Sequence, residues 1–350
     1  MKILLLGEFS GVHNNLKKKL LSLGHEVKLG ADGDSYRKFD FDFKINPYKS
    51  KFLNLLYFIW NIRKFIGHDV VQFITPFAIP YYYHFFGLIH ILFYFNKAKI
   101  YYACGTDPAF MSVKNKFKYF PLDNQSSKFE YFPNYNYFTV NYYNWFINKI
   151  DWIVPSMYTY FLGYKSNLKT TSPIPLPASD FKNGIFKKEQ KKIKIIFGIT
   201  RRDFKGSKYI LDAIKLIESK FPDLVDVSIV EGITVKEYKK LLLNSDVLID
   251  QCKSYDYGMN AIFGMENGCI VFSGSEPESM EYLNFQNCPV INILPDSNDI
   301  FNKISSIIEL ENNEIEKLKK QSLSFVRKYH SAENISNDFL QLYKMSINNL

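Results

Sequence analysis

The feature that most constrains the fold is an alternation of apolar runs with helical patterns, which occurs in both halves of the chain. In the first half, a continuous apolar run at residues 2–8 precedes a helical pattern over 11–23, in which Val12, Leu16 and Leu20 are four residues apart. Continuous apolar runs are typical of strands buried on both faces, as in parallel sheets covered by helices. Further strands are expected at residues 26–30, 69–74, 99–105 and 151–155, and further helices at 52–66 and 79–95.

The same alternation begins again near residue 192. A strand over 192–199 precedes a helix over 207–219, whose apolar residues follow an i, i+3, i+4, i+7 pattern from Ile210 to Ile217. Strands are then expected at 226–232, 246–251 and 269–274, and helices at 234–245, 258–268, 297–309, 313–329 and 332–346. Two such series predict an α/β chain with two Rossmann-like domains, each a doubly wound parallel sheet. Ligands of such sheets bind at the carboxyl ends of strands, here in a cleft that both domains face.

The domain boundary is expected within residues 174–190, which contain two prolines, a glycine and several charges and therefore resemble a linker. We expect an N-terminal domain over residues 1–178 and a C-terminal domain over 179–330. A terminal helix over 331–350 is expected to pack back toward the N-terminal domain. Residues 110–150, rich in Tyr, Phe and Asn, are expected to be irregular.

Charge and composition exclude several classes of protein. Residues 1–190 contain 24 Lys and Arg against 13 Asp and Glu, whereas residues 191–350 contain 20 against 22, so the two halves should face different partners. The four cysteines form no CxxC pair and lie near no His cluster, which argues against a zinc site and favours buried cysteines in a reducing compartment. The basic residues match no nucleic-acid reader module, so no nucleic acid is expected as a partner.

Two apolar stretches of the sequence could be considered as a signal peptide or a membrane span. The N-terminal run is too short for a signal peptide or a span. Residues 79–95 are the only stretch near membrane length, but His84, His90 and three consecutive tyrosines argue against a span. We expect a buried helix or one that inserts into a surface.

The segment RRDFKG contains three cations where a strand meets a helix. Arg201, Arg202 and Lys205 follow the strand, and Gly206 lets the chain turn into the helix. Cations beside a helix N-terminus form a strong site for a diphosphate, because the free N–H groups and the helix dipole favour anions. The alternative is a solvated turn in which Asp203 neutralises one arginine.

A second segment, residues 250–268, fits the same ligand. Asp250 ends a strand, Gly258 permits close backbone approach, and a helix begins at Met259 or Asn260. Its N–H groups could hold the other side of the diphosphate, although an ordinary strand–helix turn would use the same residue types. The donor-site residues expected around these two segments are Gly11, Arg201, Glu231, Gly232, Asp250, Tyr257, Gly258, Met259, Asn260 and Glu266.

The first half contributes three further candidates. The loop over residues 7–15 lacks the GxGxxG pattern, which disfavours NAD; its Gly11 is expected to face the cleft. His13 could contact a sugar or act as a base, or it could simply be a polar residue at a helix start. Asp107 could bind an acceptor hydroxyl, or it could be a turn aspartate before Pro108. His330 is expected to cap or pack between terminal helices.

Together these segments resemble the GT-B glycosyltransferases. RRDFKG is similar to the R-x-x-K-G element of the enzymes that transfer sugars with retention of anomeric configuration, and the match falls on Arg202 and Lys205. In that family the two cations bind the donor diphosphate and stabilise the leaving group. Residues 245–274 resemble the donor-binding segment, and the loop at 7–15 with its helix resembles the opening element.

The chain departs from the family at one motif. The family carries E-x7-E, whose glutamates contact the donor sugar and the ribose, but the matching positions here are Tyr255 and Phe263. Asp256 adjoins the first position, and Glu266 lies one helical turn beyond the second. Either could substitute, and the donor identity is open for this reason.

The resemblance implies an enzyme that transfers a sugar from a nucleotide donor, UDP- or GDP-linked, to a glycan or lipid-linked acceptor in surface polysaccharide or lipopolysaccharide synthesis. Arg202, Lys205, His13 and Asp107 would be its catalytic residues. No metal or other cofactor is expected, because no DxD motif lies where a metal would bind. A nucleotide-sugar epimerase of the same fold and a non-catalytic partner subunit are the alternatives.

The basic, aromatic first half would form the acceptor side. Lys17, Lys18 and Lys19 lie together, as do the lysines at 114, 116 and 118. Such patches suit an anionic membrane surface or a lipid-linked glycan, unless the lysines are simply solvated. We therefore expect a cytoplasmic protein, either free or peripheral on the inner membrane face.

Overall fold

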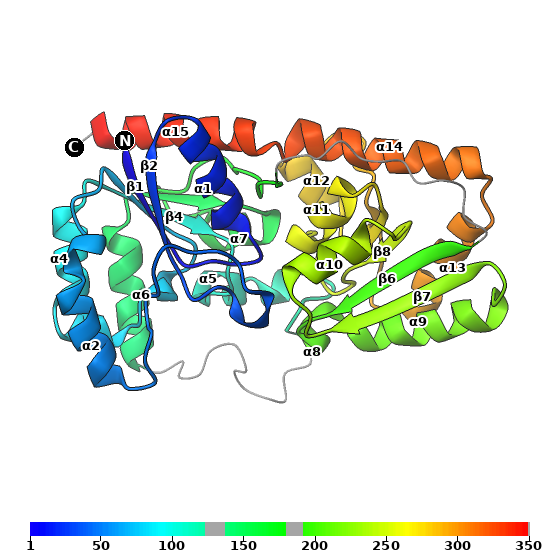
Figure 1. Ribbon diagram of the computed structural model, residues 1–350, viewed down its shortest axis with the longest axis horizontal. Coiled ribbons are helices and arrows are strands. Elements are labelled where there is room, and N and C mark those ends of the chain that lie inside the picture. The colour runs from blue at the N-terminus through cyan, green and yellow to red at the C-terminus, as the bar shows by residue number, and fades with distance from the viewer. Residues whose placement is uncertain (123–136, 180–191, 349–350) are drawn as a thin grey trace. The chain divides into compact units, whose positions relative to one another are not determined.

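The computed structural model describes residues 1–122, 137–179 and 192–348. Its contacts divide the chain into two compact units. The described residues within Met1–Val113, Ser126–Pro175 and Ala332–Leu350 form the first unit, and those within Lys114–Gln125 and Leu176–Ser331 form the second. Each unit is a parallel sheet with helices on its faces (Figure 1).

The first unit contains a five-stranded parallel sheet in the order β2-β1-β3-β4-β5. Its strands are β1 (Lys2–Leu6), β2 (Glu26–Gly30), β3 (Val70–Phe73), β4 (Ala98–Ala103) and β5 (Trp152–Pro155). Its α-helices are α1 (Val12–Ser22), α2 (Lys51–Trp60), α3 (Tyr82–Phe85), α4 (Leu88–Phe95), α5 (Pro108–Ser112), α6 (Tyr137–Lys149), α7 (Tyr158–Tyr164) and α15 (Ala332–Asn348). Short 3-10 turns are η1 (Ser35–Arg37), η2 (Ile62–Lys64) and η3 (Pro76–Ala78).

The second unit repeats this topology with the strands in the order β10-β9-β8-β6-β7. Its strands are β6 (Ile193–Ile199), β7 (Val225–Glu231), β8 (Val247–Ile249), β9 (Ile270–Ser273) and β10 (Ile291–Asn292). Its helices are α8 (Arg202–Lys205), α9 (Ser207–Lys220), α10 (Val235–Leu242), α11 (Met259–Glu266), α12 (Pro277–Tyr282), α13 (Ser297–Ile308) and α14 (Asn312–Tyr329), with a 3-10 turn η4 (Lys114–Lys116). Counted along each unit, both sheets have the order 2-1-3-4-5, as in flavodoxin-like folds.

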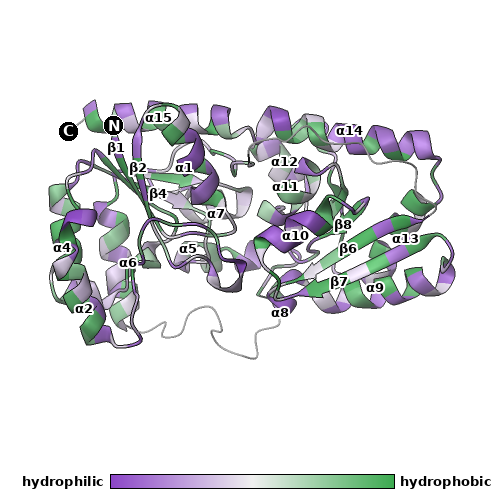
Figure 2. Cartoon of the chain, viewed as in Figure 1, coloured by the Kyte–Doolittle hydropathy of each residue, from purple (hydrophilic) through white to green (hydrophobic). Residues whose placement is uncertain are grey.

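The apolar periodicity of the sequence accounts for the core of the second unit. Ile195 on β6 lies between Val227 of β7 and Val247 of β8, and hydrophobic residues concentrate along these strands (Figure 2). The predicted apolar face of α9, including Ile210 and Ile217, is buried against them, and α13 covers the same core cluster. The predicted α/β class with two parallel sheets is confirmed.

The segment that the sequence predicts to be irregular contains a helix of 13 residues, α6. Tyr142 and Phe146, one turn apart, are fully buried, and the Phe146 ring meets Phe73 of β3 edge to face at 5.0 Å between ring centroids. The many Tyr and Asn residues weaken the helical signal, yet three aromatic rings of the helix, those of Tyr142, Tyr143 and Phe146, are buried. The helix α12 and the short strand β10 also lie where no element was predicted.

The stretch at residues 79–95 forms two short helices rather than one. Gly87 separates α3 from α4 with φ 71°, a left-handed conformation that favours glycine. None of the helices in the described part of the chain is both long and apolar enough to cross a membrane.

The terminal helix α15 lies in the first unit. Glu333 pairs with Lys19 of α1 at 2.8 Å, and Phe339 meets Tyr102 of β4 at 4.9 Å between ring centroids. Tyr343 donates a hydrogen bond to Gln72 of β3 at 2.5 Å.

Candidate functional site

The second sheet reverses its strand order between β6 and β8, which are adjacent strands with opposite onward connections. In open parallel sheets, ligands bind outside the carboxyl ends of the strands at this switch point. The RRDFKG segment follows β6, and Asp250 follows β8, so adjacent strands in the sheet bring these two segments together.

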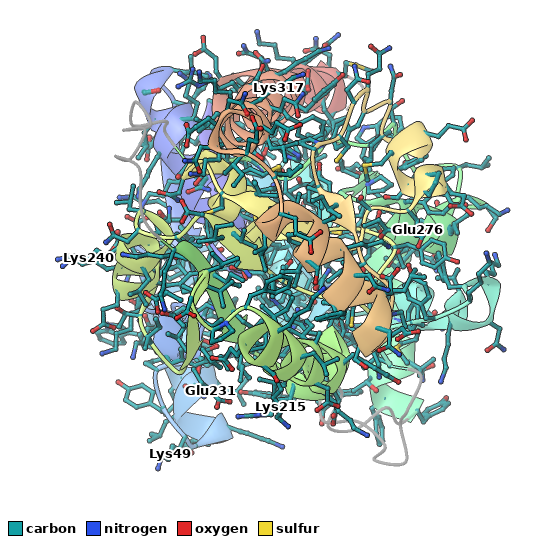
Figure 3. The ribbon with its side chains drawn as sticks, turned by 90° about the vertical axis from the view of Figure 1, so that its right-hand side faces the viewer. Lys49, Lys215, Glu231, Lys240, Glu276 and Lys317 are labelled. Carbon is teal, nitrogen blue, oxygen red and sulfur yellow. The ribbon has the colours of Figure 1, made fainter. Side chains whose placement is uncertain are left out.

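The two arginines occupy the exposed turn between β6 and α9. Arg201 has φ 46°, an uncommon conformation for a non-glycine residue, and its guanidinium lies 4.0 Å from the centre of the Phe204 ring. Arg202 contacts Glu231 at the end of β7 at 2.6 Å, and both side chains are more than half exposed. Figure 3 labels Glu231 on this part of the surface. Glu231 is therefore the partner of a cation here.

Lys205 is buried and forms an ion pair with Asp250, which is 1 % exposed. The same carboxylate accepts hydrogen bonds from Asn260 Nδ2 at 2.8 Å and from Ser273 Oγ at 3.1 Å. Ion pairs taken out of water persist only where further hydrogen bonds satisfy the charges, and this carboxylate has them. Asp250 thus fixes the position of the ammonium group and links α8 to the start of α11.

The N-terminus of α11 faces open space. Gly258 precedes the helix without a side-chain cap, and a methyl group added to it would meet no atom within 4 Å. Among the described residues, no hydrogen-bond acceptor is recorded for the backbone N–H groups of Met259, Asn260 and Ala261. Helix N-termini in this state bind anions through unpaired N–H groups and the dipole.

Sequence reasoning missed three buried hydroxyl groups around the end of β6. Thr200 Oγ1, Ser207 Oγ and the Tyr238 hydroxyl have no hydrogen-bond partner within the described ranges. The Tyr238 ring packs against Gly198, where an added Cβ would approach it to 3.0 Å, and burial together with the charge of Asp250 raises the pKa of Tyr238. Ser207 adjoins the motif, but no sequence signal points to Tyr238.

Lys253 is a fourth cation that sequence reasoning missed. It is 7 % exposed, and in the part of the chain that the structure describes no carboxylate pairs with its ammonium group. Its Cγ would lie 3.2 Å from a Cβ added to Gly206, so the side chain runs beside the turn that contains Lys205. Its position in a βα loop gave no signal, because a lysine there is usually solvated.

The positions that replace the family's glutamates belong to aromatic and polar clusters. Tyr255 is buried against the rings of Phe117 and Tyr119, and its hydroxyl accepts from the Lys118 N–H at 3.3 Å. Phe263 is buried beneath the Lys239 ammonium, which lies 4.4 Å from its ring centre. Neither residue can accept a ribose hydroxyl as a carboxylate does.

The two nearby carboxylates bind serines. Asp256 accepts from the Ser279 hydroxyl, and Glu266 accepts from both the N–H and the hydroxyl of Ser179, the latter at 2.7 Å. Both side chains are buried. Glu266 thus connects α11 to the segment that precedes β6.

Tyr257 and His330 form a further buried contact in this unit. The Tyr257 hydroxyl donates to His330 Nε2 at 2.8 Å, and His330 Nδ1 donates to the Leu176 carbonyl at 2.8 Å. Burial lowers the pKa of His330 to about 4, so the ring is neutral near pH 7. His330 also packs against Phe285 and Phe325, at the end of α14.

Gly11 and His13 lie in the first unit at the start of α1. Gly11 has φ 88°, and Glu8 accepts hydrogen bonds at 2.8 Å from the N–H groups of Gly11 and Asn14, so the chain's own carboxylate caps this helix. Burial raises the pKa of Glu8 to about 8, against the lowering effect of these N–H groups.

His13 is fully buried, and both of its ring nitrogens have partners. Nδ1 bonds the Gly7 carbonyl at 2.8 Å, and Nε2 bonds the Gln72 side-chain amide at 3.2 Å. Burial lowers its pKa to about 4. This arrangement anchors the loop at 7–15, and a role for His13 in catalysis stays a prediction.

Asp107 caps a helix in the interior of the first unit. Its Oδ1 accepts from the Phe110 N–H at 2.7 Å, and its Oδ2 accepts from the hydroxyls of Tyr101 and Tyr164, each at 2.5 Å. The side chain is fully buried, and burial raises its pKa. The structure therefore places Asp107 as the N-cap of α5, and a contact with an acceptor hydroxyl stays a prediction.

The described residues contain no group of three or more His, Cys, Asp or Glu side chains that could hold a metal ion. The structure brings together Lys205, Asp250 and Asn260, and separately Arg202 and Glu231. Gly232 follows Glu231 with φ 69°, and Met259 is the first residue of α11.

Comparison with solved structures shows what this chain resembles. It matches sucrose-phosphate synthase from Thermosynechococcus elongatus over 100 % of both chains, with a TM-score of 0.67 and 13 % identity. It matches HepE from Anabaena, in complex with UDP and glucose, over 99 % of this chain and 100 % of that one, with a TM-score of 0.61 and 10 % identity. A glycosyltransferase from Rickettsia africae matches over 99 % and 98 %, with a TM-score of 0.60 and 14 % identity.

No protein-family model matches the chain, and no curated protein matches its sequence. The two five-stranded parallel sheets, with the likeness to these structures along the whole chain, show the fold. The chain has the GT-B fold that these glycosyltransferases share.

Proposed function

We propose that this protein is a glycosyltransferase that moves a sugar from a UDP- or GDP-linked donor to a glycan or lipid-linked acceptor, in the synthesis of a surface polysaccharide or lipopolysaccharide. The observation that carries the proposal is the second unit's switch point. There the fixed Lys205 ammonium lies beside the open N-terminus of α11, to which Asp250 and Asn260 link it. The likeness to HepE, in complex with UDP and glucose, supports a nucleotide sugar as the donor.

A diphosphate suits this site because two kinds of group can share its negative charge, the backbone N–H groups of a helix and cationic side chains. The α11 N–H groups and Lys205 would hold the bridging and terminal oxygens, and Arg202 would contact the more exposed side. When the bond between the anomeric carbon and the β-phosphate oxygen breaks, negative charge accumulates on that oxygen. Hydrogen-bond donors that are already fixed in place stabilise this charge without reorganising, which lowers the activation barrier of the transfer.

The transfer step conserves atoms and charge. The acceptor hydroxyl oxygen forms a bond to the anomeric carbon, the bond from that carbon to the β-phosphate breaks, and the hydroxyl proton passes to the departing diphosphate. In the proposal this transfer retains the anomeric configuration, as the likeness of RRDFKG to the retaining enzymes suggests. The transfer requires no metal ion in this account, because Arg202, Lys253, the Lys205 ammonium and the α11 N–H groups together stabilise the charge of the diphosphate.

The ion pairs determine how much net charge each cation has available for a diphosphate before the nucleotide sugar binds. Asp250 balances the charge of Lys205, so Lys205 supplies a well-placed N–H donor rather than a net positive charge. Arg202 is exposed and its partner Glu231 is exposed, so exchanging that partner for phosphate costs little desolvation. Lys253, buried without a carboxylate partner among the described residues, adds one net positive charge beside this turn.

A non-catalytic partner subunit is the second candidate, and one observation favours it. The aromatic residues at positions 255 and 263 are buried, and Asp256 and Glu266 are bonded to Ser279 and Ser179. A chain that binds nucleotide through its phosphates but lacks a carboxylate for the sugar could bind without turnover. Both candidate functions predict nucleotide binding, but only the glycosyltransferase predicts turnover.

Release of UDP or GDP from a panel of nucleotide sugars, with and without glycan acceptors, tests the proposal. We expect release by the wild type in the presence of EDTA. Arg202→Ala should reduce release at least about tenfold, the loss of one charge-assisted contact. The neutral pair Lys205→Gln with Asp250→Asn keeps a hydrogen bond without the charges and should reduce release further.

Lys215→Ala is the matched control, because Lys215 is an exposed lysine on α9 (Figure 3). It should leave release unchanged. Nucleotide binding without release from any donor would favour the partner subunit, and release that Arg202→Ala does not change would contradict the assigned site.

A further inference from the structure

Helices α2, α3, α4 and α6 of the first unit present an unusually apolar surface. Large hydrophobic side chains protrude from all four helices, with exposed fractions of 90 % for Trp60, 82 % for Tyr94, 75 % for Tyr137, 66 % for Phe52 and 52 % for Phe85. α2 and α4 carry many of the hydrophobic residues seen in Figure 2. Contiguous exposed apolar surface of this kind marks an interaction site rather than ordinary protein surface.

Direct contacts join these helices into one surface. The Phe85 ring of α3 meets Phe138 of α6 at 5.3 Å between ring centroids, and the Lys51 ammonium of α2 lies 5.7 Å from the Tyr82 ring centre. His90 of α4 meets Trp145 of α6 at 4.5 Å between ring centroids. The exposed residues of α2 and α4 recur every three or four positions, so each helix turns a whole face outward.

The charges around this aromatic face are almost all positive. From Phe43 to Thr106 the sequence contains seven Lys and Arg but only one acidic residue, Asp69, and α6 contains none. Asp69 pairs with Lys97 at 2.8 Å. The other exposed cations at the ends of α2 are Lys49, Lys51, Arg63 and Lys64, and none has an ion-pair partner among the described residues. Lys49 projects from the surface in Figure 3.

Two of the lysines that the sequence analysis assigned to this role form ion pairs within the first unit. Lys17 pairs with Asp42 at 2.6 Å, and Lys19 pairs with Glu333 at 2.8 Å. Lys17 and Lys19 are therefore less available to an anionic partner than the unpaired cations around α2, which lie near the exposed aromatic rings.

We propose that the surface formed by α2, α3, α4 and α6 docks onto an anionic lipid bilayer. Trp and Tyr favour the headgroup level, and Lys and Arg beside them are attracted to anionic lipids. Protein–protein interfaces are depleted in Lys at their centre, which argues against a protein partner. A second copy of the chain would place two positive faces together, which argues against self-association.

This inference rests on the lipid-linked acceptor in the proposed function, because an enzyme with such an acceptor must reach the membrane. The Gly87 break between α3 and α4 suits a surface that lies in the headgroup layer and does not cross it. The helices are too short to span, so the docking is peripheral.

Co-sedimentation of the full chain with sucrose-loaded vesicles tests the inference. The experiment contains no nucleotide, so a negative result would count against membrane docking and not against the proposed donor site. Vesicles of phosphatidylcholine alone are compared with vesicles containing about 30 % phosphatidylglycerol. We expect at least about tenfold stronger binding to the anionic vesicles, weakened when salt rises from about 0.1 M to about 0.5 M. In brominated-lipid vesicles, Trp60→Phe should lose most of the tryptophan quenching that wild type shows.

Two variants separate the aromatic and electrostatic contributions. Trp60→Ser with Tyr94→Ser removes two exposed rings, and Lys49→Glu with Lys51→Glu and Arg63→Glu reverses the charge. Each should reduce binding at least about tenfold without changing the melting temperature. The control is Lys215→Glu with Lys240→Glu and Lys317→Glu, three exposed lysines of the second unit (Figure 3), which should bind as wild type does.

Absence of binding to anionic vesicles would overturn the inference. Equal loss of binding in the control variant would also overturn it, because net charge would then explain the binding. The wild type could instead fail to bind vesicles and form dimers that Trp60→Ser with Tyr94→Ser abolishes. That result would overturn the inference and assign the surface to contact with a second copy of the chain.

Discussion

Lys205 and Asp250 come from the ends of two strands that are distant in sequence and adjacent in the second sheet. Their charges lie in the interior, where an unpaired ammonium or carboxylate is far more costly than on the surface. Asn260 and Ser273 satisfy the remaining carboxylate lone pairs. The pair therefore contributes more to positioning than a surface ion pair such as that between Arg202 and Glu231.

Asp250→Asn is expected to destabilise the second unit by about 3–5 kcal/mol, because it leaves the Lys205 ammonium buried without a counter-charge. The measurement is urea unfolding followed by circular dichroism. Asp212→Asn is the matched control, since Asp212 pairs with Lys215 at the surface and its loss should change stability by less than about 0.5 kcal/mol. Equal effects of the two substitutions would show that Lys205 is solvated.

His13 predicts a pH dependence of stability in the first unit. Its pKa is lowered from 6.5 to about 4 in the folded protein, so the unfolded chain takes up a proton first as the pH falls. The stability that neutral His13 contributes is complete above about pH 6.5 and is lost as the pH falls toward 4, by at most about 3 kcal/mol.

His13→Asn should flatten this dependence, because an amide can donate to the Gly7 carbonyl without titrating. We expect the difference in unfolding free energy between wild type and His13→Asn to shrink as the pH falls from 7 to 4. Thermal unfolding across this range provides the measurement. A difference that does not change with pH would mean that His13 is solvated enough to titrate normally.

At the scale of elements, the start of α11 is a part of the second unit that an anion can approach. Gly258 has an extended backbone, so a side chain is permitted there, and the space in front of it is open. A Cβ at this position would stand where the proposed phosphate meets the helix N–H groups.

Gly258→Ala is therefore expected to weaken UDP or GDP binding at least about tenfold while costing no more than about 1 kcal/mol of stability, the difference between Gly and Ala at an N-cap. Calorimetric titration and thermal unfolding give the two quantities. Gly67→Ala, at an open turn with φ 80° in the first unit, should cost at least as much stability, about 1–2 kcal/mol, and leave nucleotide binding intact. Unchanged binding in Gly258→Ala would place the nucleotide elsewhere.

The elements also show where sequence reasoning succeeds. Strongly periodic segments such as α9 and the continuous apolar strand β6 were predicted within a residue or two, because burial on known faces dictates their pattern. The helix α6 was missed, because three Tyr and three Asn are among its 13 residues, a composition that weakens the helical pattern. The strand β10 has only two residues and leaves almost no pattern.

The sequence predicted which cations lie at the candidate site, but it did not predict which residues they pair with. Lys205 could be placed at a strand end from the RRDFKG segment alone. Its pairing with Asp250 depends on β6 and β8 being neighbours, which the strand order decides. The burial of Lys253 and the approach of Tyr238 to Gly198 depend on side-chain packing, which no single-sequence pattern contains.

At the scale of the whole molecule, the two units share one sheet order and differ in what their strand ends present. The first unit caps its opening helix with its own Glu8, whereas the second leaves the start of α11 uncapped and holds Lys205 beside it through Asp250. A ligand with a diphosphate therefore fits the second unit, and the exposed aromatic and basic surface of the first fits the membrane side of the proposed reaction.

Thermal unfolding with UDP, GDP and a panel of nucleotide sugars tests the central claim most directly, because it requires no knowledge of the acceptor. At about 100 times the dissociation constant, binding contributes about 2.7 kcal/mol, which should raise the melting temperature by roughly 5–10 °C. We predict that UDP or GDP alone produces such a shift, and that Arg202→Ala reduces it. No shift with any nucleotide or nucleotide sugar would contradict the account.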